Sequence, residues 1–165
     1  MPGYAVIDTE TTGFGATDRV IEVGVVLLND RLVHEGEWST LINPGRGPGP
    51  TEVHGITSAD LIGAPAFKDM VNDLMDVIAG RTLVGHNLKF DIRMLGYELT
   101  RCGMPGLPDG LCTLKIAGGT LTVACKAAGV QIVNKHRALG DARATAELFR
   151  YHWSGMTSES KRLAM

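Results

Sequence analysis

The sequence predicts one α/β domain in which a mixed β-sheet is flanked by helices. Two apolar, β-rich runs come first, at residues 4–8 and 20–28, and a third follows at 32–42. After residue 66, apolar positions recur with helical spacing, interrupted by one short apolar run at 82–84. The first three runs are separated by short connections and predict an antiparallel meander, to which the later, helix-flanked strand adds in parallel.

The connections and helices follow from local signals. The second run ends at an Asn-Asp turn, and the third ends in the Gly/Pro-rich segment 43–50, which we interpret as a loop. Residues Thr57 and Asp60 have the spacing of a capping box before a strongly amphipathic helix that begins near Phe67 and ends at Gly80. The remaining helices are expected over three ranges: 90–101, 121–128 and 141–153.

Composition limits the class of protein. The 165 residues are 44% apolar and 21% charged, which suits one domain over residues 1–153 followed by a polar tail at 154–165. The apolar run at 25–28 is too short to span a membrane, no longer one occurs, and no export signal opens the chain. Three cysteines without a Cys-x-x-Cys pair argue against disulfides or cysteine-bound zinc, so we expect a cytoplasmic location.

The first chemical signal is a pair of acids at the end of the first strand. Asp8 and Glu10 are two residues apart, so both side chains leave the same face. Neighbouring carboxylates repel each other, which raises the pKa of one unless a cation lies between them. Oxygen ligands of this kind suit Mg²⁺ or Mn²⁺. Taken alone, the pair is equally consistent with two acids that face water.

Two further segments carry acids at the ends of predicted elements. Asp91 lies in the first turn of a helix that follows a strand and a turn containing His86. Asp141 opens the last helix, and His136 precedes it in a loop. Each of these residues also has a purely structural interpretation. Asp91 fits an acid favoured by the helix dipole, Asp141 fits an N-cap, and His136 fits a surface histidine. Four acids and one loop histidine at element ends, in an order that a mixed sheet can bring together, favour one shared site.

Together these segments resemble the three exonuclease motifs of the DEDDh family: Asp8-x-Glu10, His86-Asn-x-x-Phe-Asp91 and His136-x-x-x-x-Asp141. The residues of these motifs are most similar to those of the proofreading (epsilon) subunits of bacterial DNA polymerase III and their stand-alone relatives. The spacer that contains Leu41-Ile-Asn-Pro and Val53-His-Gly-Ile-Thr57 resembles the same group, and the likeness covers residues 4–153. One departure is visible, because Gly118-Gly119 stands where the family has a longer helical stretch.

The resemblance implies an RNase H-like fold and 3′→5′ hydrolysis of nucleic acid that releases nucleoside 5′-monophosphates. It assigns two divalent cations, Mg²⁺ or Mn²⁺, to four ligands, with Asp8 between both ions: Asp8, Glu10, Asp91 and Asp141. His136 becomes the general base that takes a proton from the attacking water. The candidate substrate-binding residues are Thr11, Thr12, Gly13, Val53, His54, His86 and Phe90.

Charge and the first motif bear on the substrate. Without the four metal-site acids, the formal net charge changes from −2 to +2 (−2 + 4), which suits contact with a few terminal nucleotides rather than coating of a duplex. A single-stranded or frayed 3′ end is the cheapest to unstack. Oligoribonucleases have Met where this chain has Thr11, so we favour DNA over RNA as substrate.

Three alternatives stay open. The first is an exoribonuclease that trims short or structured RNA with the same four acids and histidine. The second is a non-catalytic nucleic-acid-binding or polymerase-scaffold module, against which the complete set of acids argues. The third is a catalytic subunit of a DNA polymerase, which would make that polymerase a partner of the chain.

Overall fold

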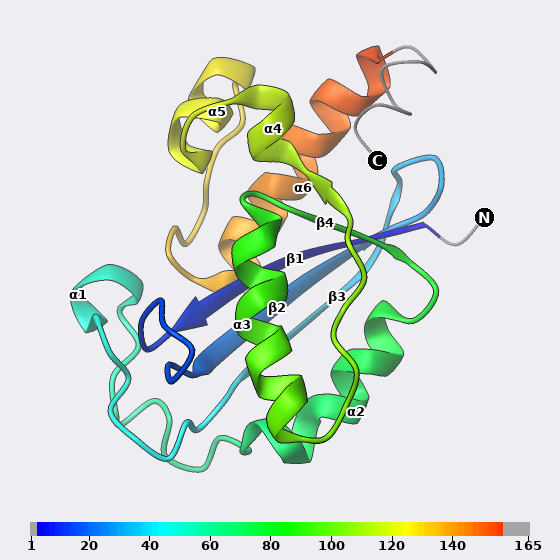
Figure 1. Ribbon diagram of the computed structural model, residues 1–165. Helices are drawn as coiled ribbons and strands as arrows, with labels where there is room; N and C mark the ends of the chain where they lie inside the picture. The colour runs from blue at the N-terminus through cyan, green and yellow to red at the C-terminus, as the bar shows by residue number, and fades with distance from the viewer. Residues whose placement is uncertain (1–2, 157–165) are drawn as a thin grey trace.

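The computed structural model describes residues 3–156, which fold into one five-stranded sheet with helices on both faces (Figure 1). The strands lie in the order β3-β2-β1-β4-β5. β1 pairs antiparallel with β2, as β2 does with β3, whereas β1–β4 and β4–β5 are parallel. The mixed sheet predicted from the sequence is confirmed. The strands are β1 Tyr4–Thr11, β2 Val20–Leu28, β3 His34–Leu41, β4 Thr82–Gly85 and β5 Leu111–Cys112.

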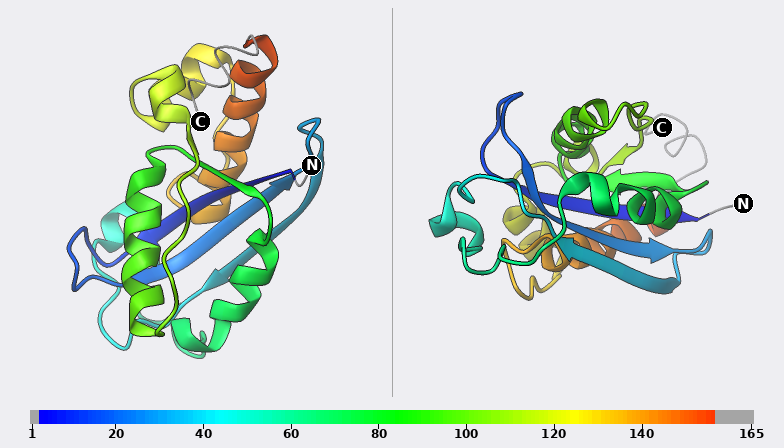
Figure 2. Two further views of the ribbon diagram at one scale, coloured as in Figure 1. Left: turned by 45° about the vertical axis from the view of Figure 1, so that its right-hand side comes forward. Right: turned by 90° about the horizontal axis from the view of Figure 1, so that it is seen from below.

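Six helices surround the sheet in the described part of the chain. α2 and α3 cover one face, α6 covers the other, and α5 packs on the outer side of α6 (Figure 2). α1 is a single turn that lies away from the sheet, near the loops at the end of β1 (Figure 1). The helices are α1 Thr51–His54, α2 Phe67–Ile78, α3 Leu88–Arg101, α4 Thr113–Ala117, α5 Leu121–Ala128 and α6 Ala138–Gly155.

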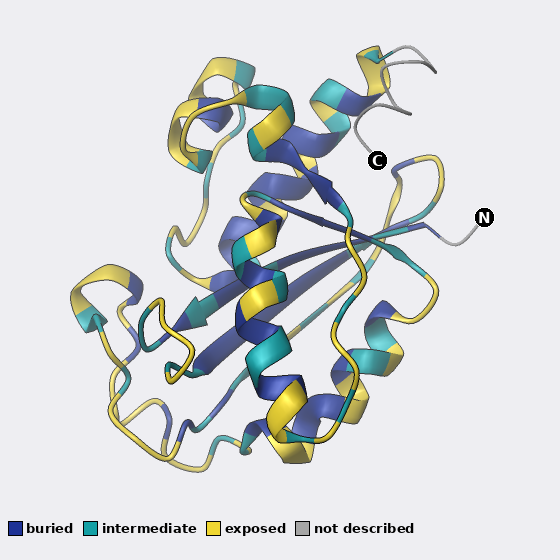
Figure 3. Ribbon diagram, in the orientation of Figure 1, coloured by how far each residue is buried: buried dark blue, intermediate teal, exposed yellow. Residues whose placement is uncertain are grey.

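Burial of β1 on both faces explains its sequence. Ala5 and Ile7 pack into the core under α2 and α3, while Val6 points to the opposite face and packs under α6. Because successive strand residues alternate in direction, the strand reads as a continuous apolar run, and it is dark blue over this stretch in Figure 3. The same alternation directs Asp8 and Glu10 toward α6, and Thr9 toward α3.

Several predicted boundaries were wrong. β1 continues to Thr11, past the predicted end at Asp8, because its polar residues still pair with β2. The predicted capping box forms its hydrogen bonds, Thr57 N–H to Asp60 Oδ2 at 2.8 Å among them, yet it closes a turn. α2 begins at Phe67, as predicted, with Ala66 as its N-cap.

The start of the last helix also differs from the prediction. α6 begins at Ala138 with Arg137 as its N-cap, so Asp141 lies inside the first turn and is not the N-cap. The helix continues to Gly155, two residues beyond the predicted end. Most of the predicted tail, from residue 157 onward, lies outside the described residues. Over residues 3–156, no helix is long and apolar enough to cross a membrane.

Candidate active site

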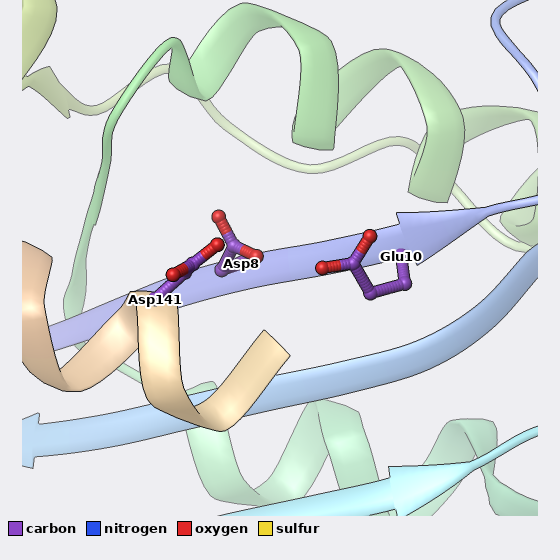
Figure 4. A group of neighbouring side chains, drawn as sticks. All are labelled: Asp8, Glu10 and Asp141. Atoms are coloured by element: carbon purple, nitrogen blue, oxygen red, sulfur yellow. The ribbon is translucent and has the colours of Figure 1, made fainter. Parts of the chain in front are cut away.

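Three of the predicted acids converge where the end of β1 meets the start of α6 (Figure 4). One carboxylate oxygen each from Asp8, Glu10 and Asp141 lies within 4.8 Å of the other two. β1 supplies the first two from one face, and the first turn of α6 projects Asp141 toward them. The three acids converge because side chains of β1 alternate between its two faces and α6 packs on the face that carries Asp8 and Glu10.

The fourth acid, Asp91, approaches from the opposite side of β1. It lies buried in the first turn of α3 and accepts a hydrogen bond of 2.8 Å from the Thr9 hydroxyl. It is not part of the three-oxygen cluster, but its charge acts on Asp8. Sequence reasoning overlooked Thr9, although its place between the two acids of the first motif puts it on the α3 face.

Burial makes the two acids of β1 hard to ionise in the metal-free protein. The pKa of Asp8 is raised well above its ordinary value, first by burial and then by repulsion from Asp91, Asp141 and Glu10. Burial also raises the pKa of Glu10 to about 8, with repulsion from Asp141 adding to it. The repulsion that the sequence predicted for this pair is therefore part of a larger effect.

Burial also raises the pKa of the two acids on helices, Asp91 and Asp141, but hydrogen bonds oppose that rise. Burial raises the pKa of Asp91 to about 7, and the Thr9 hydrogen bond opposes that rise. Burial likewise raises the pKa of Asp141, opposed by the backbone N–H of His136, which donates to Asp141 Oδ2 at 3.2 Å. A nearby cation reverses this balance because it favours the ionised form of every carboxyl around it.

The donor set fits a hard divalent cation. Each of the four acids offers carboxylate oxygens, the ligands that Mg²⁺ and Mn²⁺ prefer. Asp141 Oδ1 is buried and has no hydrogen-bond partner among the described residues. An uncompensated buried carboxylate oxygen is costly, and a cation held beside Asp8 and Glu10 would satisfy it.

His136 occupies the loop that leads into α6. The loop, residues 129–137, connects α5 to α6, and His136 is half-buried with a left-handed backbone at φ +60°. Its backbone N–H to Asp141 ties this residue to the acid cluster. This position agrees with the predicted role beside the acids and leaves that role a prediction.

The loop between β1 and β2 folds around one aspartate. The Thr12 hydroxyl donates to Asp18 Oδ1 at 2.9 Å and accepts from the Arg19 N–H at 3.0 Å. The Thr11 hydroxyl donates to the Gly13 carbonyl at 2.7 Å, and a Cβ on Gly13 would lie 2.6 Å from Asp18 Oδ2. Both hydroxyls are therefore bonded within the loop. A contact of this segment with substrate would come from the loop backbone and from the residue at its tip.

The tip of this loop presents an aromatic residue that sequence reasoning missed. Phe14 is 76% exposed and packs edge-to-face against Phe90, with 5.8 Å between the ring centroids. The Arg93 guanidinium lies over the Phe90 ring at 5.5 Å from its centroid. Phe14 directly follows Gly13 in the first motif, and that adjacency was the available signal. We call Phe14, Phe90 and Arg93 the aromatic platform.

The remaining predicted substrate residues have different surroundings. Val53 is exposed on α1, whereas His54 is buried and its Nδ1 accepts a hydrogen bond of 3.0 Å from the Ile56 N–H. Burial lowers the pKa of His54, which keeps the ring neutral. The side chain of His54 therefore stabilises the turn after α1, and Val53 presents the exposed surface there.

Both ring nitrogens of His86 are occupied by the chain itself. Nε2 lies 3.1 Å from the Gly119 carbonyl oxygen and Nδ1 lies 2.9 Å from the Thr113 hydroxyl. A carbonyl only accepts, so Nε2 carries the proton and Nδ1 accepts from Thr113. His86 thus fastens α4 and the Gly118-Gly119 turn to the end of β4. The connection that departs from the family pattern is therefore held by His86.

A fold of this kind with a carboxylate cluster at the end of its central strand is typical of nucleases. The exonuclease family model RNase_T matches residues 5–149. The chain is 34% identical to the DNA polymerase III epsilon subunit of Treponema pallidum, with 88% of this chain and 74% of that protein covered. It is 30% identical to the PolC-type DNA polymerase III of Clostridium perfringens over 94% of this chain. The chain spans only 12% of that polymerase.

Solved structures share the fold. The Escherichia coli ExoI–ssDNA complex in its zinc-bound form superposes with a TM-score of 0.82 at 16% identity, covering 97% of this chain and 42% of that one. The nuclease domain of 3′hExo, a DEDDh family member bound to rAMP, gives a TM-score of 0.79 at 18% identity, covering 92% and 91%. The chain therefore belongs to the exonuclease family. It is similar in sequence to the epsilon subunits of DNA polymerase III, and it shares its RNase H-like fold with a DEDDh exonuclease.

Proposed function

We propose that this chain hydrolyses phosphodiester bonds at the 3′ ends of DNA, preferring single-stranded or frayed ends and releasing nucleoside 5′-monophosphates. The observation that carries the proposal is the convergence of three carboxylates at the end of β1, with Asp91 behind them. His136 stands beside this cluster, tied to Asp141. Family membership as an exonuclease supports the reaction class.

Asp8, Glu10, Asp91 and Asp141 would hold two divalent cations, Mg²⁺ or Mn²⁺, with Asp8 placed to contact both. Bound cations of this kind supply water activation and stabilise negative charge on the phosphate and the leaving oxygen. The four carboxyls contribute the negative charge that keeps such cations in place. His136 accepts the proton of the attacking water as the general base.

The aromatic platform supports a grip on terminal bases. The exposed Phe14 ring, which packs against Phe90, offers a stacking surface to any base, and Arg93 adds a cation that can meet the phosphate backbone. The backbone of the Thr11–Gly13 segment, which follows Glu10 in the chain, and exposed Val53 would contact the terminal nucleotide. Stacking is easiest for unpaired ends, which is why we propose single-stranded substrates.

DNA is the favoured substrate, and RNA is the second candidate. Thr11 in the first motif and the similarity to epsilon subunits support DNA. A specific observation keeps RNA in view, because the 3′hExo nuclease domain of the same fold was captured with rAMP. A non-catalytic module is disfavoured, since all four acids and His136 are present around one site.

The relatives also bear on partners. Since the similar proteins include DNA polymerase III epsilon subunits, we propose a DNA polymerase as a protein partner of the chain. A cytoplasmic location stays a prediction from the sequence.

The decisive experiment digests 5′-end-labelled single-stranded DNA and RNA of one sequence side by side, with Mg²⁺ or Mn²⁺. We expect a ladder that shortens from the 3′ end, faster on DNA, with nucleoside 5′-monophosphates as products. A 3′-phosphate should block the reaction and a 5′-phosphate should not. Cleavage of circular single-stranded DNA would contradict an exonuclease, and equal or faster digestion of RNA would favour the second candidate.

A further inference from the structure

Two residues of β2 lie next to the acids of β1. In the β1–β2 ladder Glu22 is directly opposite Glu10, and Gly24 is directly opposite Asp8. Residues opposite each other in an antiparallel pair share one face of the sheet. Glu22 and Gly24 therefore face α6 beside the acid cluster, and we call them the loop seat. The exonuclease motifs used above include neither residue.

The Glu22 carboxylate holds the junction between the His136 loop and α6. Arg137 Nε lies 3.1 Å from both of its oxygens, and Arg137 Nη2 donates to Oε1 at 2.6 Å. The backbone N–H of Ala138 donates to Oε2 at 2.9 Å. Glu22 is only 5% exposed, whereas the Arg137 side chain is 47% exposed, so the carboxylate end of these charge-assisted bonds is the part shielded from water. The two residues that follow His136 are thus fixed to β2.

Close backbone packing completes the seat. A Cβ on Gly24 would lie 2.3 Å from the Leu139 nitrogen, so the first turn of α6 rests on the bare backbone of β2. A Cβ on Gly140 would lie 2.3 Å from the Asn134 carbonyl oxygen, so the loop folds back onto the same turn. The left-handed backbone of His136 itself is uncommon for a residue with a side chain. Such a conformation persists where surrounding contacts determine it.

We infer that Glu22 is a positioning residue for the base: it holds residues 137–138 so that His136 reaches the attacking water. This rests on the proposed function, in which His136 takes the proton. Base catalysis depends strongly on geometry, and a displacement of about 1 Å can cost about 10²-fold in rate. The seat therefore links the catalytic rate to a strand that carries no motif acid.

The inference also accounts for a fifth buried carboxylate beside four that already repel one another. Glu22 raises the pKa of Asp8, Glu10 and Asp141, so an unpaired charge there would compete for the cation. Its oxygens are instead engaged by Arg137 and Ala138, and it lies outside the group of three that could hold a metal. Arg137 thus keeps Glu22 a structural partner of the loop.

The test breaks the contact from both sides, with Glu22→Gln and Arg137→Met. Both variants should lower kcat on single-stranded DNA with Mn²⁺ by about 10–100-fold, with KM and calorimetric Mn²⁺ affinity unchanged. Exchange of the Ala138 amide in the metal-free protein should speed up, which is a readout independent of activity.

Coupling to His136 separates positioning from general damage to the fold. If Glu22 acts through His136, the double variant Glu22→Gln/His136→Ala should be no slower than His136→Ala alone. Multiplying losses would overturn the inference. A drop in Mn²⁺ affinity in Glu22→Gln but not in Arg137→Met would make Glu22 a metal ligand and would overturn it as well.

The chain offers a matched control on the neighbouring strand. Glu37 of β3 pairs with Arg143 of α6 through two bonds, Nε–Oε1 at 2.9 Å and Nη2–Oε2 at 2.5 Å. This pair also joins the sheet to α6, but it is exposed and makes no contact with the His136 loop among the described hydrogen bonds. Glu37→Gln should keep the wild-type kcat.

The outcomes distinguish a failure of the proposed function from a failure of the positioning role of Glu22. Wild-type protein that releases no nucleotide would remove the proposed function, while the Ala138 amide would still report on the seat. Active wild-type protein with Glu22→Gln and Arg137→Met indistinguishable from Glu37→Gln would remove the inference and leave the proposed function standing.

Discussion

Thr9 donates a 2.8 Å hydrogen bond to Asp91 across 82 positions of the chain. Thr9 stands between Asp8 and Glu10 on β1, but it points to the other face, where α3 begins. The central strand therefore supplies two acids to one side and anchors a third acid on the other. Through Thr9, the position of Asp91 relative to Asp8 is set by β1 and not by α3 alone.

The Thr9 hydroxyl should matter for Asp91 more than for the fold. Thr9→Val keeps the shape but removes the donor that opposes the raised pKa of Asp91, so that pKa should rise further. We expect lower activity at pH 6–7, partial recovery at higher pH, and a stability loss of about 1 kcal/mol. Rates across pH and urea unfolding measure both effects. Thr40→Val on β3 is the control, and an unchanged pH profile in Thr9→Val would contradict the assignment.

Metal removal should abolish activity. EDTA removes the cations that the carboxylates would hold, and Mg²⁺ or Mn²⁺ should restore the rate, whereas Ca²⁺ should restore little because its looser coordination positions water poorly. Labelled single-stranded DNA is the assay. Full activity in EDTA would exclude a metal site built on these acids.

Asp8→Asn should separate function from stability. It removes a charge from a cluster whose members repel one another, so we expect loss of activity together with an unchanged or higher Tm of the metal-free protein. Thermal denaturation in EDTA gives the Tm. A lower Tm would show that Asp8 stabilises the fold by itself.

The stability of the metal-free protein should fall as pH rises. The folded pKa of Glu10 is about 8 against an ordinary 4.5, and that of Asp91 is about 7 against 3.8. The folded chain therefore binds more protons than the unfolded chain between these values, so the free energy of unfolding decreases with pH across this window. Tm in EDTA should drop from about pH 5 to about pH 8.

Two comparisons test that interpretation. Added Mg²⁺ should raise the Tm more at pH 8 than at pH 5, because the cation replaces protons on the same carboxyls. Glu10→Gln should flatten the dependence in EDTA. A Tm that rises with pH in EDTA would show that these carboxyls are already ionised without metal.

Phe14→Ala should weaken substrate binding and leave the fold intact. The ring is 76% exposed, so its loss should change the free energy of unfolding by no more than about 0.5 kcal/mol. Stacking on one base contributes about 1–3 kcal/mol, which predicts a KM for single-stranded DNA raised about 5- to 150-fold. Tyr151→Ala, which removes an exposed aromatic residue on α6, is the control. An unchanged KM would exclude the platform from the substrate path.

The sequence predicted the fold well where periodicity and pairing agree. The range of β2 matches its predicted bounds, as does that of α5, since turn and glycine signals close both. β5, a strand of two residues, and the single-turn helix α1 were missed because neither is long enough to show a period. The start of α6 was misplaced since Asp141 resembles an N-cap, whereas Glu22 bonds the amide of Ala138 and starts the helix earlier.

The site was predictable in its acids and less so in their supports. Motif spacing identified the residues that converge, because they lie at the ends of elements that one sheet brings together. Thr9, Glu22 and Phe14 were not identified, since their roles depend on which face each residue occupies and which distant element it meets. The Thr11 and Thr12 hydroxyls turned inward because Asp18 and Gly13, a few residues away, compete for them.

The two-faced character of β1 has a consequence for folding. A slip of one residue against β2 would turn Asp8 and Glu10 into the apolar core among Leu88, Met94 and Leu95, and would move Ile7 out of it. Burying two carboxyls in a purely apolar layer is so unfavourable that the wrong alignment cannot compete. The same acids that would hold the cations therefore also select the correct pairing of β1 with β2 during folding.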